Sequence, residues 1–189
     1  MLSPLKAPAQ PGSDIMQQFD RDRYCQRIGH QNEVRTTEDG LRSLHRQQLC
    51  AIPFENFDVL LGRPIELDPD SLFAKLVCRP RGGYCFELNG LFLHVLRSFG
   101  FAARPLLARV HLSGSSVIGR GHQISLVTID GREWLTDVGF GGFNMREPIP
   151  LEINRLNHCN GQDLRLVRAD PYGTMLQVLT SEQKWLNLY

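Results

Sequence analysis

Arg81-Gly82-Gly83-Tyr84-Cys85-Phe86-Glu87-Leu88-Asn89-Gly90 organises the first half of this chain, because two glycines and a cysteine stand directly before an amphipathic run. The apolar residues of the run recur with helical spacing, at Leu88, Leu91, Phe92, Val95, Leu96 and Phe99. This spacing predicts a helix with one buried face, and Gly100 is a typical stop signal. Cys85 is therefore expected at the helix N-terminus, where free N–H groups and the helix dipole favour an anion.

A thiol at that position loses its proton more readily and becomes a nucleophile. The alternative interpretation is that Cys85 is a small buried hydrophobic residue, as most free cysteines are. A thiolate nucleophile needs a base, and the base needs a group that orients it. The first interpretation of Cys85 therefore requires a partner pair elsewhere in the chain.

A predicted β-hairpin supplies such a pair. Residues 121–129 have the composition of a strand, Asp130-Gly131 is a strong signal for a two-residue turn, and 132–138 is the return strand. With that turn, Asp137 and His122 lie on one face as diagonal neighbours, with Cα atoms ~7–8 Å apart. A three-residue loop would instead shift the register by one residue and separate them onto opposite faces.

In this arrangement Asp137 would hold one nitrogen of His122 and leave the other facing the thiol. The alternative interpretation makes His122 an ordinary hydrogen-bonded strand histidine and Asp137 a strand-end residue before the turn at Gly139. The coincidence of both with Cys85 favours a Cys-His-Asp site.

An ordered series of segments resembles the arylamine N-acetyltransferase family, over nearly the whole chain from about Phe19. The segments are Tyr24-Cys25-Gln26-Arg27-Ile28-Gly29, Ile52-Pro53-Phe54-Glu55-Asn56-Phe57-Asp58-Val59-Leu60, Arg81 to Asn89, Ala108-Arg109-Val110, His122 and Asp137-Val138-Gly139-Phe140-Gly141. The spacings of 37 and 15 residues between Cys85, His122 and Asp137 also resemble the family.

The resemblance implies acetyl-CoA-dependent transfer to arylamines, arylhydroxylamines or hydrazines by a ping-pong mechanism. Cys85 would accept the acetyl group, His122 would be the base and Asp137 the orienting acid, and coenzyme A would leave. The resemblance also places residues around them: Phe140, Val110 and Phe54 as substrate-binding residues, and Glu55 and Arg81 as a supporting charge pair. Acetyl-CoA is the co-substrate, and no metal is expected, since Cys78, Cys85 and His94 lack zinc-ligand spacing.

The sequence departs from the family in two places. Gly121 precedes the histidine where the family usually has a hydroxyl residue, and family members continue past the position of Tyr189 into a third, α/β domain. We therefore expect the activity of these 189 residues to be impaired.

The sequence leaves three other functions open. Two of them use the same Cys-His-Asp group, and the third uses none of its residues. One is an amide synthase acting on a thioester-linked polyketide, and another is a thiol hydrolase. The third is an inactive two-domain remnant that acts as a binding protein. For that remnant, the apolar end from Trp185 to Tyr189 predicts an unpaired strand edge and self-association through it.

Composition limits the classes of partner and the cellular compartment that we expect. A net charge of +1 predicts neither a nucleic-acid nor a membrane partner, and five irregularly spaced cysteines argue against a disulfide framework. We interpret Cys25, Cys50, Cys78 and Cys159 as reduced packing residues. The sequence has no apolar run of about 20 residues and no signal-peptide pattern at its start, so we expect a cytoplasmic protein.

The predicted fold class is α+β, because helical patterns precede strand patterns. Residues 1–18 are expected to be a disordered arm, 19–100 a helical bundle carrying the nucleophile, and 101–189 an antiparallel β-barrel-like domain carrying the histidine and the acid. The resemblance implies a core like that of cysteine proteases. Helices are expected at 19–28, 37–49, 70–77 and from Cys85, and strands at 104–112, 122–129, 133–138, 164–168, 175–179 and 184–188.

Overall fold

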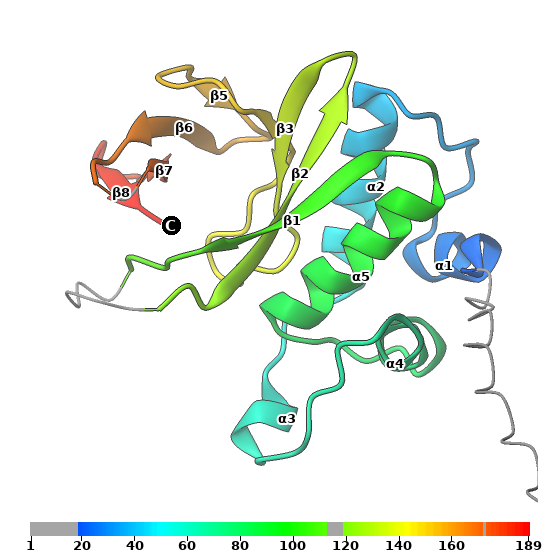
Figure 1. The fold of residues 1–189 in the computed structure, drawn as a ribbon. Coiled ribbons are helices and arrows are strands. Elements are labelled where there is room, and N and C mark those ends of the chain that lie inside the picture. Colours follow the sequence, from blue (N-terminus) through cyan, green and yellow to red (C-terminus); the bar gives the residue numbers. More distant parts are fainter. Residues whose placement is uncertain (1–18, 113–118, 172) are drawn as a thin grey trace, which may run out of the picture.

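The computed structural model describes residues 19–112, 119–171 and 173–189, so the predicted arm at 1–18 lies outside the described residues. Helices come first along the chain and strands second, as predicted (Figure 1). The helices are α1 (Arg21–Ile28), α2 (Glu38–Ala51), α3 (Phe57–Leu60), α4 (Pro69–Phe73), a π-helical turn (Ala74–Cys78) and α5 (Cys85–Ser98). The strands are β1 (Ala102–Ala108), β2 (His122–Ile129), β3 (Arg132–Thr136), β4 (Ile149–Pro150), β5 (Asn157–His158), β6 (Asp163–Arg168), β7 (Thr174–Leu179) and β8 (Trp185–Asn187).

The strands form two antiparallel sheets, with orders β1-β2-β3-β4 and β5-β6-β7-β8. The expected barrel-like closure is wrong, because neither sheet closes on itself in the described part of the chain. Closure needs a continuous ladder, and here the first sheet ends at the two-residue strand β4, with no ladder to β5. The segment after β1 still approaches the second sheet, where the His111 N–H donates to the Leu188 carbonyl at 2.8 Å.

The hairpin register is the one predicted from a two-residue turn. Ile129 pairs with Arg132, and both turn residues have positive φ, +49° at Asp130 and +77° at Gly131. Such φ values match the type I′ turns that favour Asp-Gly. The register brings His122 and Asp137 to the same face of the sheet.

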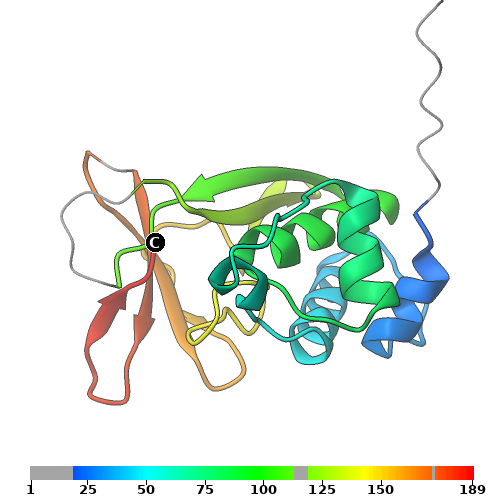
Figure 2. The ribbon, with the colours of Figure 1, turned by 90° about the horizontal axis from the view of Figure 1, so that it is seen from below.

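The first sheet has a hydrophobic core on each face. On one face α5 packs across β1 and β2, and Val127 and Trp134 join the buried side chains of the helices. On the other face Leu126 and Leu135 join those of the second sheet. The helices and the strands β5–β8 consequently lie at opposite ends of the molecule in both views (Figures 1 and 2). Because one core crosses residue 100, the division of the chain there stays a prediction.

The helix that begins at Cys85 has the predicted buried face. Leu88, Leu91, Phe92, Val95 and Leu96 are all buried in the first core, and Gly100 follows the helix with φ +91°. This packing anchors α5 along its length and so fixes where its N-terminus points. None of the helices in the described ranges is long and apolar enough to span a bilayer.

Candidate active site

Cys85 is the first residue of α5, and its side chain is partly exposed. Glu87 caps the first turn of α5, because its Oε2 accepts a hydrogen bond from the Tyr84 N–H at 3.1 Å. A side chain at Gly83 would collide with this carboxylate, since a Cβ there would lie 2.9 Å from Oε2. The absence of a side chain at Gly83 therefore permits the capping interaction. The Cys85 thiol points toward the Gly121 carbonyl, with Sγ 3.7 Å from the oxygen.

His122 and Asp137 form the pair that the hairpin predicts. His122 Nε2 lies 2.7 Å from Asp137 Oδ2, and both side chains are buried. Burial lowers the pKa of His122, but Asp137 and a hydrogen-bonding contact with Cys85 outweigh it and raise the pKa to about 9. Burial likewise raises the pKa of Asp137, and its hydrogen bonds and the charge of His122 more than offset this, so the net shift is downward.

Asn89 holds the acid in place from α5. Its Nδ2 donates to Asp137 Oδ1 at 2.9 Å and to the Gln123 carbonyl at 2.7 Å, while its Oδ1 accepts from the Val138 N–H at 3.0 Å. The Gly139 N–H adds a further donor to Oδ1 at 2.9 Å. One carboxylate oxygen of Asp137 is thus occupied by two donors, which leaves the other oxygen for His122.

Gly139 also allows the loop after Asp137 to pass close to the nucleophile helix. A Cβ at Gly139 would lie 3.1 Å from the Cys85 Cα and 2.9 Å from Asn89 Nδ2. Such contacts leave no room for a side chain, so glycine at this position lets the acid and the cysteine come together.

A second histidine contacts the backbone of the same residue. His45, on α2, is fully buried, and its Nε2 lies 3.0 Å from the Asp137 backbone carbonyl. Since a carbonyl only accepts, Nε2 must carry the proton. Burial lowers the pKa of His45 to about 4, and the nearby Asp137 only partly opposes this shift.

Two aromatic rings enclose His122. The Phe140 and Tyr189 ring centroids lie 5.1 and 5.0 Å from that of His122, and 5.1 Å from each other. Tyr189 is buried, and its pKa is raised by burial and by the neighbouring Asp137 carboxylate. Its hydroxyl makes no well-formed hydrogen bond within the described residues.

The remaining predicted site residues are the charge pair and two of the substrate-binding residues. Glu55 and Arg81 form the predicted charge pair, with Oε1 and Nη2 2.6 Å apart. Phe54 pairs with Gly83 in an isolated bridge, and its ring is 3.8 Å from where a Gly141 side chain would begin. Val110 is half-buried and lies two residues after the end of β1.

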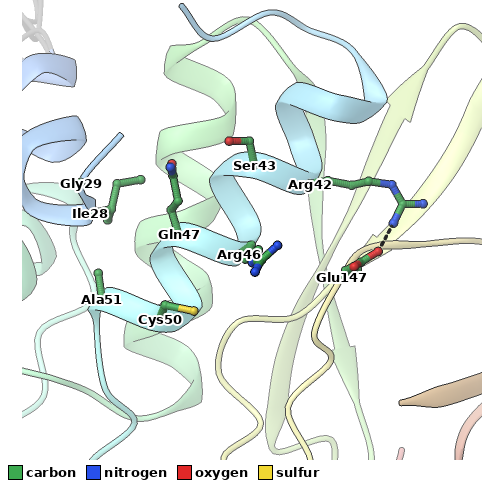
Figure 3. A pocket seen from close by; sticks show the side chains of 9 residues that line it. All are labelled: Ile28, Gly29, Arg42, Ser43, Arg46, Gln47, Cys50, Ala51 and Glu147. Carbon is green, nitrogen blue, oxygen red and sulfur yellow. Dashed lines mark hydrogen bonds and ion pairs between the residues drawn. The ribbon is translucent and has the colours of Figure 1, made fainter. Parts of the chain in front are cut away.

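The structure also corrects the interpretation of one cysteine. All five are free, as expected, but Cys50 is exposed and is not a packing residue. It lines a cavity of about 720 Å³ between the end of α1, one face of α2 and Glu147 (Figure 3). Arg42 and Glu147, which both line this cavity, form an ion pair with Nη1 and Oε2 2.6 Å apart. Cys85 and His122 do not line it, so its chemistry is separate from theirs.

A smaller cavity of about 360 Å³ lies between the two sheets and is bounded by Tyr189. Its walls are mainly apolar, including Leu106, Ile124, Leu166 and Leu176. Tyr189 also contacts the His122 ring, but Cys85, His122 and Asp137 are not among the residues that line this cavity. No cluster of potential metal ligands occurs among the residues that the structure describes.

Sequence reasoning missed two residues that contact Asp137, His45 and Asn89, and it missed Lys75, which pairs with the capping residue Glu87. The Asn89 signal was available, because a polar residue one turn after Cys85 lies beside the apolar face of the same helix. His45 has no partner pattern in the sequence, which leaves it as a structural or surface histidine. Lys75 approaches α5 only through the π-helical turn, which the helical pattern at 70–77 does not reveal.

A thiol beside an imidazole that is held by a buried carboxylate is the arrangement of nucleophilic cysteine enzymes. A family model described as N-acetyltransferase matches residues 37–189. The arylamine N-acetyltransferase / N-hydroxyarylamine O-acetyltransferase of Salmonella typhimurium is 42% identical over 167 residues, and the arylamine N-acetyltransferase of Escherichia coli is 42% identical over 168. These matches cover 88% of this chain and 57% and 59% of the relatives.

A solved structure of the Mycobacterium marinum arylamine N-acetyltransferase in complex with CoA superposes with a TM-score of 0.85 at 35% identity. The superposition covers 90% of this chain and 64% of that one. The chain thus spans a little under two thirds of the length of these relatives. The match of the family model to most of the chain, together with these identities, shows that the chain belongs to the arylamine N-acetyltransferase family.

Proposed function

We propose that this chain carries the acetyl-transfer site of an arylamine N-acetyltransferase, with acetyl-CoA as donor and an arylamine, arylhydroxylamine or hydrazine as acceptor. The observation that supports it most is the contact of Cys85 with His122, which is itself 2.7 Å from the buried Asp137 carboxylate. Membership of the family supports the choice of acetyl transfer over other thiol chemistry. The relative whose structure was solved in complex with CoA supports the choice of donor.

At the start of the first half-reaction His122 already holds the proton that Cys85 has given up, and the sulfur attacks the thioester carbonyl of acetyl-CoA. A sulfur–carbon bond forms at Cys85, the carbon–sulfur bond to coenzyme A breaks, and His122 returns the proton to the departing thiolate. A His122 pKa of about 9 suits this step, because the imidazolium persists at neutral pH beside the buried carboxylate. The two sulfurs are comparable leaving groups, so this half-reaction is reversible.

In the second half-reaction the acceptor nitrogen attacks the acetyl group on Cys85. His122 takes the proton from the nitrogen, the bond between sulfur and acetyl breaks, and the acetylated amine leaves. Asp137 keeps His122 in the tautomer and orientation that both proton transfers need. Phe140 and Phe54 would form the apolar surface for an aromatic acceptor, and Val110 would join them in the substrate complex.

The test is to incubate the chain with acetyl-CoA and to map the adduct by peptide mass spectrometry. Acetylation of Cys85 in the wild type, its loss in Cys85→Ser and its retention in Cys50→Ser are expected. Cys50→Ser is the matched control because Cys50 is the exposed thiol of the separate cavity. An adduct on another cysteine that persists in Cys85→Ser would refute the assignment.

A second assay identifies the fate of the acetyl group. Release of free coenzyme A thiol from acetyl-CoA is followed with and without a substituted aniline. Release that rises with the amine and is matched by acetylated product supports transfer. Release at an unchanged rate would instead mean hydrolysis of acetyl-Cys85.

A further inference from the structure

We propose that Lys75 is a positioning residue for Cys85, acting through Glu87 to hold the first turn of α5. The inference uses the proposed function only for the role of Cys85. Lys75 lies on the π-helical turn before the Arg81–Cys85 loop, and no substrate contact is required of it.

The contacts of Lys75 are short, and they are shielded from water. Its Nζ lies 2.6 Å from Glu87 Oε1 and 2.7 Å from Asp58 Oδ2. The Lys75 side chain is 16% exposed, and that of Glu87 only 4%. Ion pairs between exposed groups contribute little, but a pair this deeply buried strongly affects the group that loses its partner.

Glu87 uses its two oxygens for different purposes. Oε2 accepts from the Tyr84 N–H and closes the capping box of α5, while Oε1 is bound by Lys75. The carboxylate that fixes the start of the helix is therefore itself fixed by the Lys75 ammonium. Cys85 lies between the two ends of this capping interaction.

Lys75 also contacts the other side of the loop through its backbone. Its carbonyl accepts a hydrogen bond from the Arg81 N–H at 3.3 Å. One residue thus holds the chain before Gly82-Gly83 and, through Glu87, the chain after them. Single π-helical turns of this kind occur frequently at functional sites.

The neighbouring charges show why Lys75 cannot be replaced by another cation already present. Asp58 is also contacted by Arg81 and Arg63, at 3.2 and 3.3 Å, so it keeps partners when Lys75 is removed. Among the described residues, Lys75 is the only cation paired with Glu87. Its loss would leave the Glu87 carboxylate buried without a counter-ion. That carboxylate would then turn toward water or bind a proton, and the cap would weaken.

The test measures the reactivity of Cys85 with iodoacetamide at about pH 7, followed on the Cys85 peptide by mass spectrometry, with Cys50 as an internal reference. We expect Lys75→Met to slow the modification of Cys85 roughly tenfold, because the thiol would move away from His122 and react as an ordinary one. Cys50 should react at an unchanged rate. The control Lys184→Met removes an exposed lysine paired with Glu182 and should change neither rate.

A double-mutant cycle separates this role from general destabilisation. Glu87→Gln keeps an oxygen that can cap Tyr84 but needs no counter-ion. Lys75→Met should therefore change Cys85 reactivity less than about twofold when Glu87 is already glutamine. This comparison remains available if Lys75→Met alone does not fold.

Equal slowing by Lys75→Met in both backgrounds, or an unchanged Cys85 rate in a folded Lys75→Met protein, would overturn the proposal. The assay needs no acetyl-CoA. A wild-type chain that reacts with iodoacetamide but forms no acetyl-Cys85 would refute the proposed function and leave the role of Lys75 open to the same test.

Discussion

His122 and His45 are two buried imidazoles that contact the same residue, Asp137, through different atoms, yet their pKa values shift in opposite directions. His122 contacts the carboxylate and has a pKa raised to about 9. His45 contacts the backbone carbonyl and has a pKa lowered to about 4. Near neutral pH one ring is therefore charged and the other is neutral.

The difference shows that burial alone does not set the state of a histidine. Burial disfavours the charged form of both rings, and it wins at His45, where the direct contact is a neutral dipole. At His122 the direct contact is a full negative charge, and the Cys85 side chain adds to it. Asp137 thus supports a proton-carrying ring through its carboxylate and a structural ring through its backbone carbonyl.

The largest expected effect comes from Asp137→Asn. The Asn89 and Gly139 N–H groups donate to Oδ1, so the amide oxygen of the new side chain would take that place and its NH₂ would face His122. His122 would then carry its proton on the wrong nitrogen, and acetyl transfer should fall about 10⁴-fold. The contact of His45 with the backbone should persist. Transfer rates and thermal unfolding are measured together, and a loss of activity that merely follows unfolding would show that Asp137 is only structural.

The next effect concerns the residue that holds Asp137. Asn89→Ala removes three hydrogen bonds, two of which are buried, including the one to Asp137 Oδ1. We expect a loss of about 2–4 kcal/mol in the free energy of unfolding, measured by urea titration, because the abandoned groups stay buried. The surface control Asn187→Ala should cost less than about 0.5 kcal/mol. Equal costs for the two variants would contradict the role assigned to Asn89.

The two histidines should also give opposite slopes of stability against pH. The raised pKa of His122 stabilises the fold fully below about pH 6.5, and this contribution is lost as pH rises toward 9. The lowered pKa of His45 stabilises it above about 6.5, and that contribution is lost as pH falls toward 4. Each shift corresponds to a contribution on the order of 3 kcal/mol at most.

Unfolding free energies across this pH range check both slopes. The difference between wild type and His122→Ala should vary only on the alkaline side, and that between wild type and His45→Leu only on the acid side. Subtracting each variant from wild type cancels the carboxylates that titrate in the same acid range. A reversal of the two sides would break the comparison.

The smallest expected effect is that of His45 on acetyl transfer. His45→Leu leaves the Asp137 carbonyl without its donor, which should cost about 1–3 kcal/mol of stability. The carboxylate of Asp137 keeps its other bonds, so transfer should fall less than about tenfold, far less than in Asp137→Asn. His45→Gln retains an N–H donor and should recover part of the stability. A drop as large as that of Asp137→Asn would place His45 in the proton path.

The sequence predicts the parts of this site that depend on local periodicity. The apolar positions from Leu88 to Leu96 predict the α5 face, and Asp130-Gly131 determines the register that brings His122 to Asp137. In both cases the signal lies within a few residues of the structure it specifies. The ion pair of Glu55 with Arg81 follows instead from the resemblance to the family.

The parts that sequence reasoning missed depend on contacts between distant segments. His45 and Asp137 are 92 residues apart. The spacing of Leu41 and Leu44 predicts the buried face of α2 that carries His45, but it does not show that this face meets the hairpin. The barrel-like expectation was wrong for a related reason. Strand patterns predict that strands form, but whether β4 pairs with β5 depends on long-range geometry.

The most direct test of this account is an NMR titration of the imidazole groups of His122 and His45 in one wild-type sample. The account predicts a charged His122 at about pH 7 that loses its proton near pH 9, and a neutral His45 that gains one only near pH 4. Assignment by the variants His122→Ala and His45→Leu identifies the two signals. Two rings that titrate together near pH 6.5 would contradict the central claim that Asp137 holds them in opposite states.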